Sequence, residues 1–383
     1  MPPHATKGFY MRITNGRVFN GQGFEDADVL VNGDRFVAEY DYVDDGIVID
    51  AAGCIVAPGL IDLHFHGCMG QDFCNATDES IDTIASYQAS QGVTAICPAT
   101  MTFPEEILGP IMDTAARFEP SDGQSALVGI NMEGPFISPH KVGAQNPAYV
   151  QAADLAMLER LQERSGGLVK LVDIAPEEPG NLEFVSQAAG KARISIAHTC
   201  CSYEDASAAF EAGARHMTHL YNAMPGLHHR EPGPIAAAAD RDDVTCEIIC
   251  DGVHIKPSMV RLAFKIFGAD RMILISDTVE ACGLADGKYH LGGQEIFVNG
   301  NRATLADGTL AGGATNLARC LAVAANEMGI PLADALKAAT INPARALGID
   351  AERGSIEPGK IADCILLDAN NAVAKVILRG KEL

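Results

Sequence analysis

The sequence predicts an α/β protein in which a (β/α)8 TIM-type barrel carries a second, small β-sandwich domain formed from both chain ends. Apolar runs alternate with amphipathic helical stretches through the middle of the chain, which is typical of a parallel sheet built from βα units. Short strand-like runs and turn pairs such as Asn15-Gly16 and Pro358-Gly359 occupy both ends. No Gly-rich dinucleotide-binding turn follows an early strand, so a barrel is favoured over an open doubly wound sheet.

The two chain ends are predicted to form one domain together. The first part of the chain has strand-like runs at residues 11–13, 17–19, 28–31, 35–37 and 47–50, punctuated by Asn20-Gly21, Asn32-Gly33 and Asp45-Gly46. This module is too small to cover its own sheet, and strand-like runs at 361–367 and 375–378 can complete it. We therefore expect a β-sandwich domain from residues 1–57 and 355–383, and a barrel domain from residues 58–354.

The barrel domain contains about eight predicted strands. They lie at residues 60–67, 93–97, 127–133, 169–174, 194–198, 214–219, 245–250 and 272–277. Helical stretches separate most of them, at residues 80–90, 104–118, 152–164, 203–212, 257–267 and 314–328.

The composition limits the classes of partner. The 383 residues include 28 Lys and Arg against 50 Asp and Glu, a net charge of −22, whereas a nucleic acid or an anionic membrane requires an extended basic surface. No apolar run reaches the roughly 18 residues of a membrane span. Residues 1–7 indicate a loose tail, and no apolar segment of a signal peptide follows them. The 11 scattered cysteines are typical of reduced thiols in a cytoplasmic protein.

His64 and His66 lie in an apolar run that begins after Pro58-Gly59. In a buried strand the two imidazoles project from one face, where they suit a metal ion, although two hydrogen-bonded histidines at a strand end would give the same pattern. The wider distribution favours the metal. Other metal-capable residues also fall at the carboxyl ends of predicted strands, where barrel enzymes assemble their sites: Glu133, His198, His219 and Asp277.

A barrel with His-x-His on its first strand, later histidine ligands and an Asp on its last strand resembles the amidohydrolase superfamily. Within it, four motifs of this chain resemble the family of N-acetylglucosamine-6-phosphate deacetylases. They are Asn131-Met132-Glu133-Gly134-Pro135-Phe136, His219-Leu220-Tyr221-Asn222-Ala223-Met224, Asp251-Gly252-Val253-His254 and Ile275-Ser276-Asp277. The likeness covers nearly the whole chain. It implies metal-dependent hydrolysis of the N-acetyl group of N-acetylglucosamine 6-phosphate, which gives glucosamine 6-phosphate and acetate.

The resemblance also implies a metal centre. Glu133, His198 and His219 would hold a zinc or iron ion with one position open for water, and His64 and His66 allow a second ion that shares Glu133. Asp277 would take a proton from the attacking water as general base and return it to the leaving amine as general acid. A carboxylate that caps the next segment is the alternative for Asp277.

Substrate contacts follow from the same resemblance. Arg230 and His254 match phosphate contacts, although Arg230 could instead pair with Glu231. The other implied substrate-binding positions are Ala144, Gln145, Asn222, Ala223, Asp251, Leu310, Ala311 and Gly312. His254 and Arg230 are implied to reach a neighbouring subunit's site, which predicts a homodimer. No role is implied for His140, His228, His229 and His290, which are typical of solvated loops.

Gln145 departs from the family pattern. It stands where the family carries a histidine that hydrogen-bonds the acetyl carbonyl. A Gln amide can donate such a hydrogen bond but cannot carry positive charge. The metal would then polarise the carbonyl to a larger extent, or the preferred substrate would differ.

Two other functions remain compatible with the sequence. Another amidohydrolase could act on a different N-acyl substrate or open a cyclic amide, but many such relatives use a carboxylated lysine at the position of Glu133, and no predicted strand end carries a lysine. A non-catalytic barrel that serves in assembly is the second alternative. The intact set of metal-capable residues together with Asp277 speaks against it.

Overall fold

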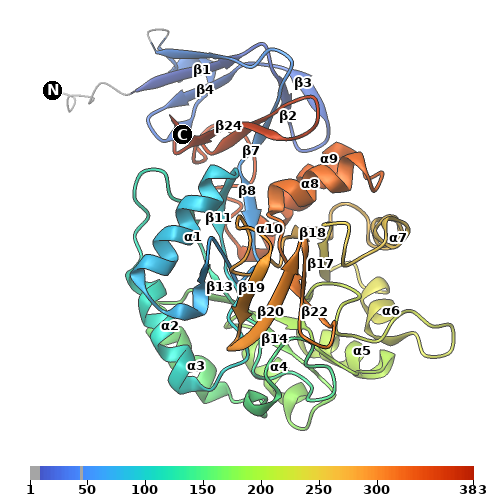
Figure 1. The fold of residues 1–383 in the computed structure, drawn as a ribbon. Coiled ribbons are helices and arrows are strands. Elements are labelled where there is room, and N and C mark those ends of the chain that lie inside the picture. The colour runs from blue at the N-terminus through green and yellow to red at the C-terminus, as the bar shows by residue number, and fades with distance from the viewer. Residues whose placement is uncertain (1–8, 44–45) are drawn as a thin grey trace.

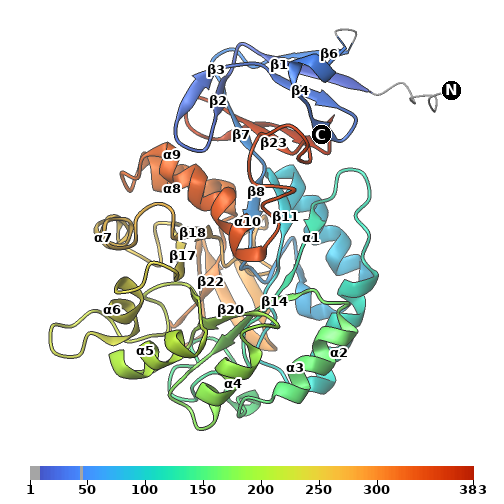
Figure 2. The same ribbon diagram turned by 180° about the vertical axis from the view of Figure 1, so that it is seen from behind.

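The computed structural model describes residues 9–43 and 46–383. The predicted tail at residues 1–7 and Asp45 of the Asp45-Gly46 turn lie outside these residues. The described chain forms a barrel of parallel strands ringed by helices, with a smaller layered β-structure at one end of it (Figures 1 and 2; Figure 2 is the view from behind). This arrangement is the predicted fold class.

The described residues contain eight parallel barrel strands, arranged in chain order. They are β8 (Leu60–Asp62), β11 (Val93–Ile96), β13 (Ile130–Met132), β14 (Val169–Ile174), β15 (Arg193–Ile196), β16 (His216–Met217), β17 (Thr245–Ile249) and β18 (Met272–Ile275). Strand β12 (Ala126–Leu127) flanks β11, and a bridge between Ala99 and Asn131 leads on to β13. Next to β18, the backbone N–H of Asp277 donates to the carbonyl of His64 at 2.9 Å, which closes the ring against the β8 segment.

Most of the helices cover the outside of the barrel, whereas the last one packs against the apolar cluster of the barrel interior. The helices are α1 (Asp78–Ser90), α2 (Glu105–Arg117), α3 (Leu155–Arg164), α4 (Asn181–Ala188), α5 (Tyr203–Ala212), α6 (Gly233–Ala239), α7 (Pro257–Phe267), α8 (Leu317–Asn326), α9 (Leu332–Ala339) and α10 (Ile341–Leu347). The bounds of α5 and α7 are as predicted, because Ser202 forms a capping box and Pro257 occupies a first helical position. The prediction lacks α4, α6, α9 and α10. No helix of the described chain combines the length and apolarity needed to cross a membrane.

Strands from both chain ends build the smaller β-structure, as predicted. One sheet has the order β5 (Arg35–Phe36), β4 (Val29–Asn32), β1 (Tyr10–Thr14), β6 (Ile47–Asp50). The other has the order β25 (Lys381–Glu382), β24 (Val373–Leu378), β23 (Cys364–Leu367), β7 (Ile55–Pro58), β2 (Arg17–Phe19), β3 (Phe24–Asp26). Strand β23 pairs antiparallel with β7, and one buried apolar cluster joins Met11 and Ile13 to Ile377.

A four-stranded antiparallel sheet after β18 is absent from the prediction. It consists of β19 (Gly287–Leu291), β20 (Gln294–Asn299), β21 (Arg302–Thr304) and β22 (Leu310–Gly313), and it crosses in front of the barrel in Figure 1. A shorter hairpin, β9 (Gly67–Cys68) and β10 (Gln71–Asp72), follows β8. The turn pairs Gly292-Gly293 and Asn299-Gly300 mark the larger sheet in the sequence. The prediction assigns no structure there because its eight strands are complete at Asp277.

Gly59 allows the close approach of β8 and β11. A Cβ atom at Gly59 would lie 2.2 Å from Oγ1 and 2.4 Å from Cγ2 of the buried Thr94. We expect Gly59→Ala to lower the free energy of unfolding by about 1–3 kcal/mol through overpacking, measured by urea denaturation. Gly23→Ala is the matched control, because no atom of residues 9–43 and 46–383 lies within 4 Å of its added methyl group. Equal stability of the two variants would contradict the packing argument.

Candidate active site

The metal-capable residues predicted from the sequence gather at one rim of the barrel. Glu133 directly follows β13, and His198 and His219 lie two residues beyond the ends of β15 and β16. Asp277 lies two residues beyond β18. Because parallel strands bring their carboxyl ends to the same rim, side chains far apart in the sequence converge there.

His64 and His66 lie beyond β8 and not within it. The predicted strand over residues 60–67 is wrong in its extent, because β8 ends at Asp62. The backbone N–H of His66 instead donates to the carbonyl of Thr278 at 2.7 Å, so this segment bonds across to the chain after β18. The two imidazole centroids are 5.8 Å apart with the ring planes at 83°.

Three of the site residues have left-handed backbone conformations. The φ angles are 42° for His198, 28° for His219 and 49° for Asp277. Residues with a Cβ rarely adopt this region, at a cost of about 1–3 kcal/mol each. Such strain concentrates at functional sites, where the surrounding structure enforces it.

Glu133, His198 and His219 form a first group of potential metal ligands. Oε1 of Glu133 lies 3.0 Å from Nε2 of His198 and 3.2 Å from Nε2 of His219, and the two Nε2 atoms are 3.1 Å apart. All three side chains are buried. A tetrahedral ion with bonds of about 2.0–2.1 Å keeps its ligand atoms about 3.3 Å apart, so the spacing fits a common ion.

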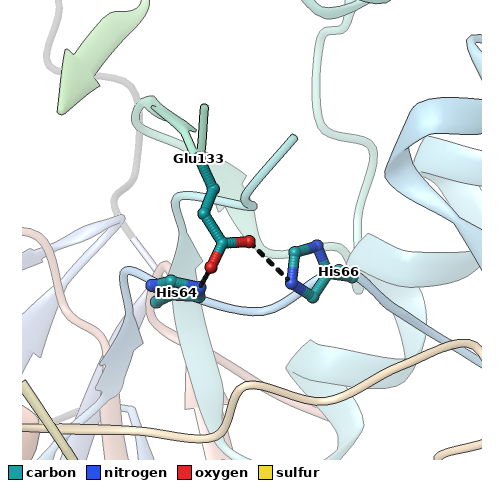
Figure 3. A group of neighbouring side chains, drawn as sticks. All are labelled: His64, His66 and Glu133. Carbon is teal, nitrogen blue, oxygen red and sulfur yellow. Dashed lines mark ion pairs between the residues drawn. The ribbon is translucent and has the colours of Figure 1, made fainter. Parts of the chain in front are cut away.

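His64 and His66 form a second group that shares Glu133 (Figure 3). Nε2 of His64 lies 3.5 Å from Oε1 of Glu133, and Nε2 of His66 lies 3.3 Å from Oε2. Both rings point toward the carboxylate from the segment after β8. A single carboxylate therefore faces both groups.

Hydrogen bonds on the far sides of two rings show that the residues fit a cation. Nδ1 of His198 lies 2.9 Å from the carbonyl oxygen of Lys141, and Nδ1 of His64 lies 3.0 Å from Oε2 of Glu247. Both partners accept, so each Nδ1 carries a proton and each Nε2 of a neutral ring presents a lone pair. Lone pairs that face a carboxylate repel it unless a proton or a cation lies between them.

The charge balance of the rim supports the same conclusion. Burial lowers the pKa of His64, but Glu247 and Glu133 outweigh it and hold this pKa well above its usual value. Burial would raise the pKa of Glu133, yet the neighbouring histidines hold it well below its usual range. Both directions favour a positive charge between Glu133 and these rings, either a proton or a metal ion that displaces it.

Asp277 stands beside the second group. Its Oδ1 lies 3.4 Å from Nε2 of His66 and 3.7 Å from Nε2 of His64. Burial would raise its pKa, but His66 and His64 keep the pKa below the ordinary value. Within the described residues, no backbone N–H of the following segment donates to this side chain. The capping alternative therefore has no support in the structure, and the lowered pKa favours the ionised form of Asp277, which is able to accept a proton.

A cavity of about 450 Å³ opens over the rim. Predicted site residues that line it are His66, Glu133, Ala144, Gln145, His198, His219, Asn222, Ala223, His254, Asp277, Leu310 and Gly312. The inserted sheet contributes part of the wall through Leu291 and Leu310. His64, Asp251 and Ala311 are buried outside the lining, and Arg230 is exposed outside it.

Comparison with known proteins identifies the family. The sequence profile described as "Amidohydrolase family" matches residues 55–383. The chain belongs to this family. Membership implies a divalent metal centre, in agreement with the two groups of ligands around Glu133.

Several relatives of this amidohydrolase are similar over most of its length. It is 36% identical over 334 residues to N-acetylglucosamine-6-phosphate deacetylase of Bacillus subtilis (strain 168), which covers 86% of this chain and 84% of the relative. It is 32% identical over 329 residues to N-acetylgalactosamine-6-phosphate deacetylase of Escherichia coli O157:H7, with 85% and 87% covered. These findings confirm the resemblance seen in the sequence.

A solved structure confirms the fold class. It is a mutant N-acetyl-D-glucosamine-6-phosphate deacetylase from Mycobacterium smegmatis in complex with N-acetyl-D-glucosamine-6-phosphate. It superposes on this amidohydrolase with a TM-score of 0.90 at 30% identity, covering 98% of this chain and 99% of the other.

Gln145 contacts the shared carboxylate of the amidohydrolase site. Its Oε1 accepts the backbone N–H of Thr102 at 2.7 Å, and its Nε2 donates to Oε2 of Glu133 at 2.7 Å. The bond from Thr102 fixes which end of the amide faces Glu133. Gln145 therefore steadies Glu133 and presents a neutral donor to the cavity.

His254 and Arg230 occupy different positions relative to the cavity. Oδ2 of the buried Asp251 accepts from Nδ1 of His254 at 2.7 Å, which orients the imidazole. His254 lines the cavity of its own chain, and its predicted reach into a neighbouring subunit stays a prediction. Arg230 is exposed and donates to Nε2 of His229 at 2.8 Å, with no ion pair to Glu231 among the described residues.

Three residues in and below the cavity were missed in the sequence. His140 is exposed in a loop, as expected, and also lines the cavity with Lys141, which is the only Lys or Arg in the lining of the described chain. They lie four and five residues after the motif around Glu133, so their position was a usable signal. Glu247 belongs to no motif, and its signal was an acid inside the buried run 245–250.

Proposed function

We propose that this amidohydrolase removes the N-acetyl group of N-acetylglucosamine 6-phosphate and releases glucosamine 6-phosphate and acetate. The observation that carries the proposal is a shared carboxylate, Glu133, which lines one cavity together with His66, His198, His219 and Asp277. The names of the relatives supply the substrate class, a 6-phosphorylated N-acetyl amino sugar. The intact site weighs against a non-catalytic role, and the similarity favours this substrate over other acyl compounds.

The residues fit a metal centre of one or two ions. Glu133, His198 and His219 would hold the first, and His64 and His66 would hold a second with Glu133 shared. Imidazole and carboxylate ligands suit zinc or iron. When bound, such an ion supplies a Lewis acid that lowers the pKa of water and polarises an acyl oxygen.

Asp277 moves the proton in this proposal. Asp277 is a buried carboxylate whose pKa lies below its ordinary value. It accepts a proton from the water whose oxygen attacks the acetyl carbon. The C–N bond then breaks, and Asp277 returns the proton to the sugar nitrogen, because an amine is a poor leaving group as its anion. Gln145 steadies Glu133 and can donate its remaining amide N–H to the acyl oxygen.

The other end of the cavity would take the phosphate. Ala223 can donate its backbone N–H, whereas the side-chain amide of Asn222 donates to the carbonyls of His219 and Leu220 and would shape the site. His254 and Lys141 supply positive charge in a chain of net charge −22. Leu310 and Gly312 would line the sugar, and Ala311 supports them from the buried side.

Arg230 is proposed to complete a neighbouring subunit's phosphate site in a homodimer. It is exposed outside its own cavity, and its guanidinium has the planar shape that binds phosphate with two hydrogen bonds. We also propose residues 1–57 with 355–383 and residues 58–354 as the two domains. Eleven free cysteines and a phosphorylated substrate suit a cytoplasmic location.

A substrate panel tests the function. We expect kcat/KM for N-acetylglucosamine 6-phosphate to exceed that of the unphosphorylated sugar by about 10²-fold or more, since charged hydrogen bonds contribute about 1.5–3 kcal/mol each. Acetate release would be measured with N-acetylgalactosamine 6-phosphate in parallel, because one relative carries that name. Equal rates with and without the phosphate would contradict the phosphate site.

Asp277→Asn tests the proton transfer. We expect kcat to fall by about 10²- to 10⁴-fold, the usual contribution of a general acid and base, with metal content and melting temperature retained. The exposed Asp242→Asn is the matched control. Retained turnover in Asp277→Asn would remove this residue from the mechanism.

Metal analysis tests the shared carboxylate. After loading with zinc and dialysis, we expect two ions per chain in the wild type and one in His66→Asn, because only one of the two groups loses a ligand. Glu133→Gln should lose both. The exposed His290→Asn serves as the control. Two ions retained in His66→Asn would exclude the second group.

A further inference from the structure

A carboxylate lies inside the barrel below the active-site rim. Glu247 is fully buried on β17 and shares a strand face with Ile249, which belongs to an apolar cluster of the barrel interior. Branched apolar side chains usually fill barrel interiors, and a buried carboxylate is costly unless charged or hydrogen-bonded partners surround it. The partners of Glu247 therefore indicate its role.

The donors to Glu247 come from two segments of the rim. Its Oε2 lies 3.0 Å from Nδ1 of His64 and 3.0 Å from the backbone nitrogen of His219. Its Oε1 lies 3.0 Å from Nε2 of His216, whose other ring nitrogen is 2.6 Å from Oγ1 of Thr245. One oxygen thus contacts one potential ligand of each metal group.

The contact between Glu247 and His64 determines which nitrogen of the His64 ring faces Glu133. A carboxylate that already accepts other hydrogen bonds has no proton to give, so Nδ1 of His64 is the donor. The nearby amide of Asn131, at 3.3 Å from Nδ1, can direct its N–H to the carbonyl of Leu63 instead. Nε2 of His64 then presents its lone pair toward Glu133, and this atom has no hydrogen-bond partner among the described residues.

We propose that Glu247 is a positioning residue of the metal centre, which fixes the tautomer and ring orientation of His64 and holds the backbone that carries His219. The inference rests on the metal centre proposed above and not on the identity of the sugar. It assigns to Glu247 an effect on metal retention and none on substrate contacts, since Glu247 does not line the cavity.

Glu247→Gln tests the proposal with nearly unchanged shape. We expect metal affinity at the His64 position to fall by about 10- to 100-fold, as for other residues that orient metal ligands, measured by dialysis against graded chelator concentrations. The absorption bands of the cobalt-loaded protein should change. The value of kcat should fall at limiting metal and recover in excess metal, while KM for the phosphorylated sugar stays unchanged.

Asp173→Asn is the matched control. Asp173 is also fully buried, on β14, and its carboxylate accepts from Oγ1 of Thr218 at 2.8 Å without a hydrogen bond to His64 or His219. We expect its chelator profile and cobalt spectrum to match the wild type. A wild-type profile for Glu247→Gln, or equal losses in both variants, would overturn the proposal, since equal losses indicate a general need for polar groups in the barrel.

The tautomer of His64 can be tested in the wild-type protein, so this test does not require a Glu247 variant to fold. Two-bond ¹H–¹⁵N spectra of the zinc-loaded wild type, with His64 assigned by His64→Asn, should show Nδ1 of His64 protonated. A proton on Nε2 would overturn the proposal. The metal measurements use no sugar, so they do not depend on the proposed substrate. If metal retention changes in Glu247→Gln but the wild type does not deacetylate the phosphorylated sugar, only the substrate assignment is rejected.

Discussion

The whole site depends on one buried anion, because Glu133 faces four imidazoles at distances of 3.0–3.5 Å. An ionised carboxylate without compensating charge would cost several kcal/mol at this depth. The neutral rings of His64 and His198, which donate from Nδ1, present lone pairs to it and cannot compensate, so the arrangement requires protons or a cation among these atoms. The barrel supplies the geometry by bringing strand ends from distant parts of the chain to one rim.

Holding the site residues in this arrangement lowers the free energy of unfolding. Three left-handed residues, His198, His219 and Asp277, lie in the turns that direct their side chains inward. The polar layer that contains Glu247 replaces apolar side chains in the barrel interior. Helices packed around the strands offset these costs through a large apolar cluster with fully buried members such as Leu158 and Phe210. A rigid scaffold is needed because ligand atoms must stay within a few tenths of an ångström of their positions.

The sequence shows where buried strands end, and this made most of the rim predictable: Glu133, His198, His219 and Asp277 each follow an apolar run. The extent of β8 was not predictable in the same way. The segment at His64 is buried but does not pair as a strand, and apolarity alone does not distinguish a buried strand from such a segment. Glu247 was missed because its role depends on a residue 183 positions away. The location of Arg230 outside its own cavity likewise depends on loop packing and not on any local pattern.

Chemistry and substrate choice belong to different parts of this molecule. The reacting end is fixed by strand termini, whereas loop 140–146 and the inserted sheet enclose the cavity above it. Gln294 on β20 donates to the carbonyl of Ala144 at 2.6 Å, which ties the sheet to that loop. Relatives that carry the names of two different amino-sugar phosphates are similarly related to this chain. Glucosamine and galactosamine differ at one hydroxyl group remote from the acetamide. With the acetamide at the rim, as proposed, the loop 140–146 and the inserted sheet would be the parts of the cavity that distinguish them.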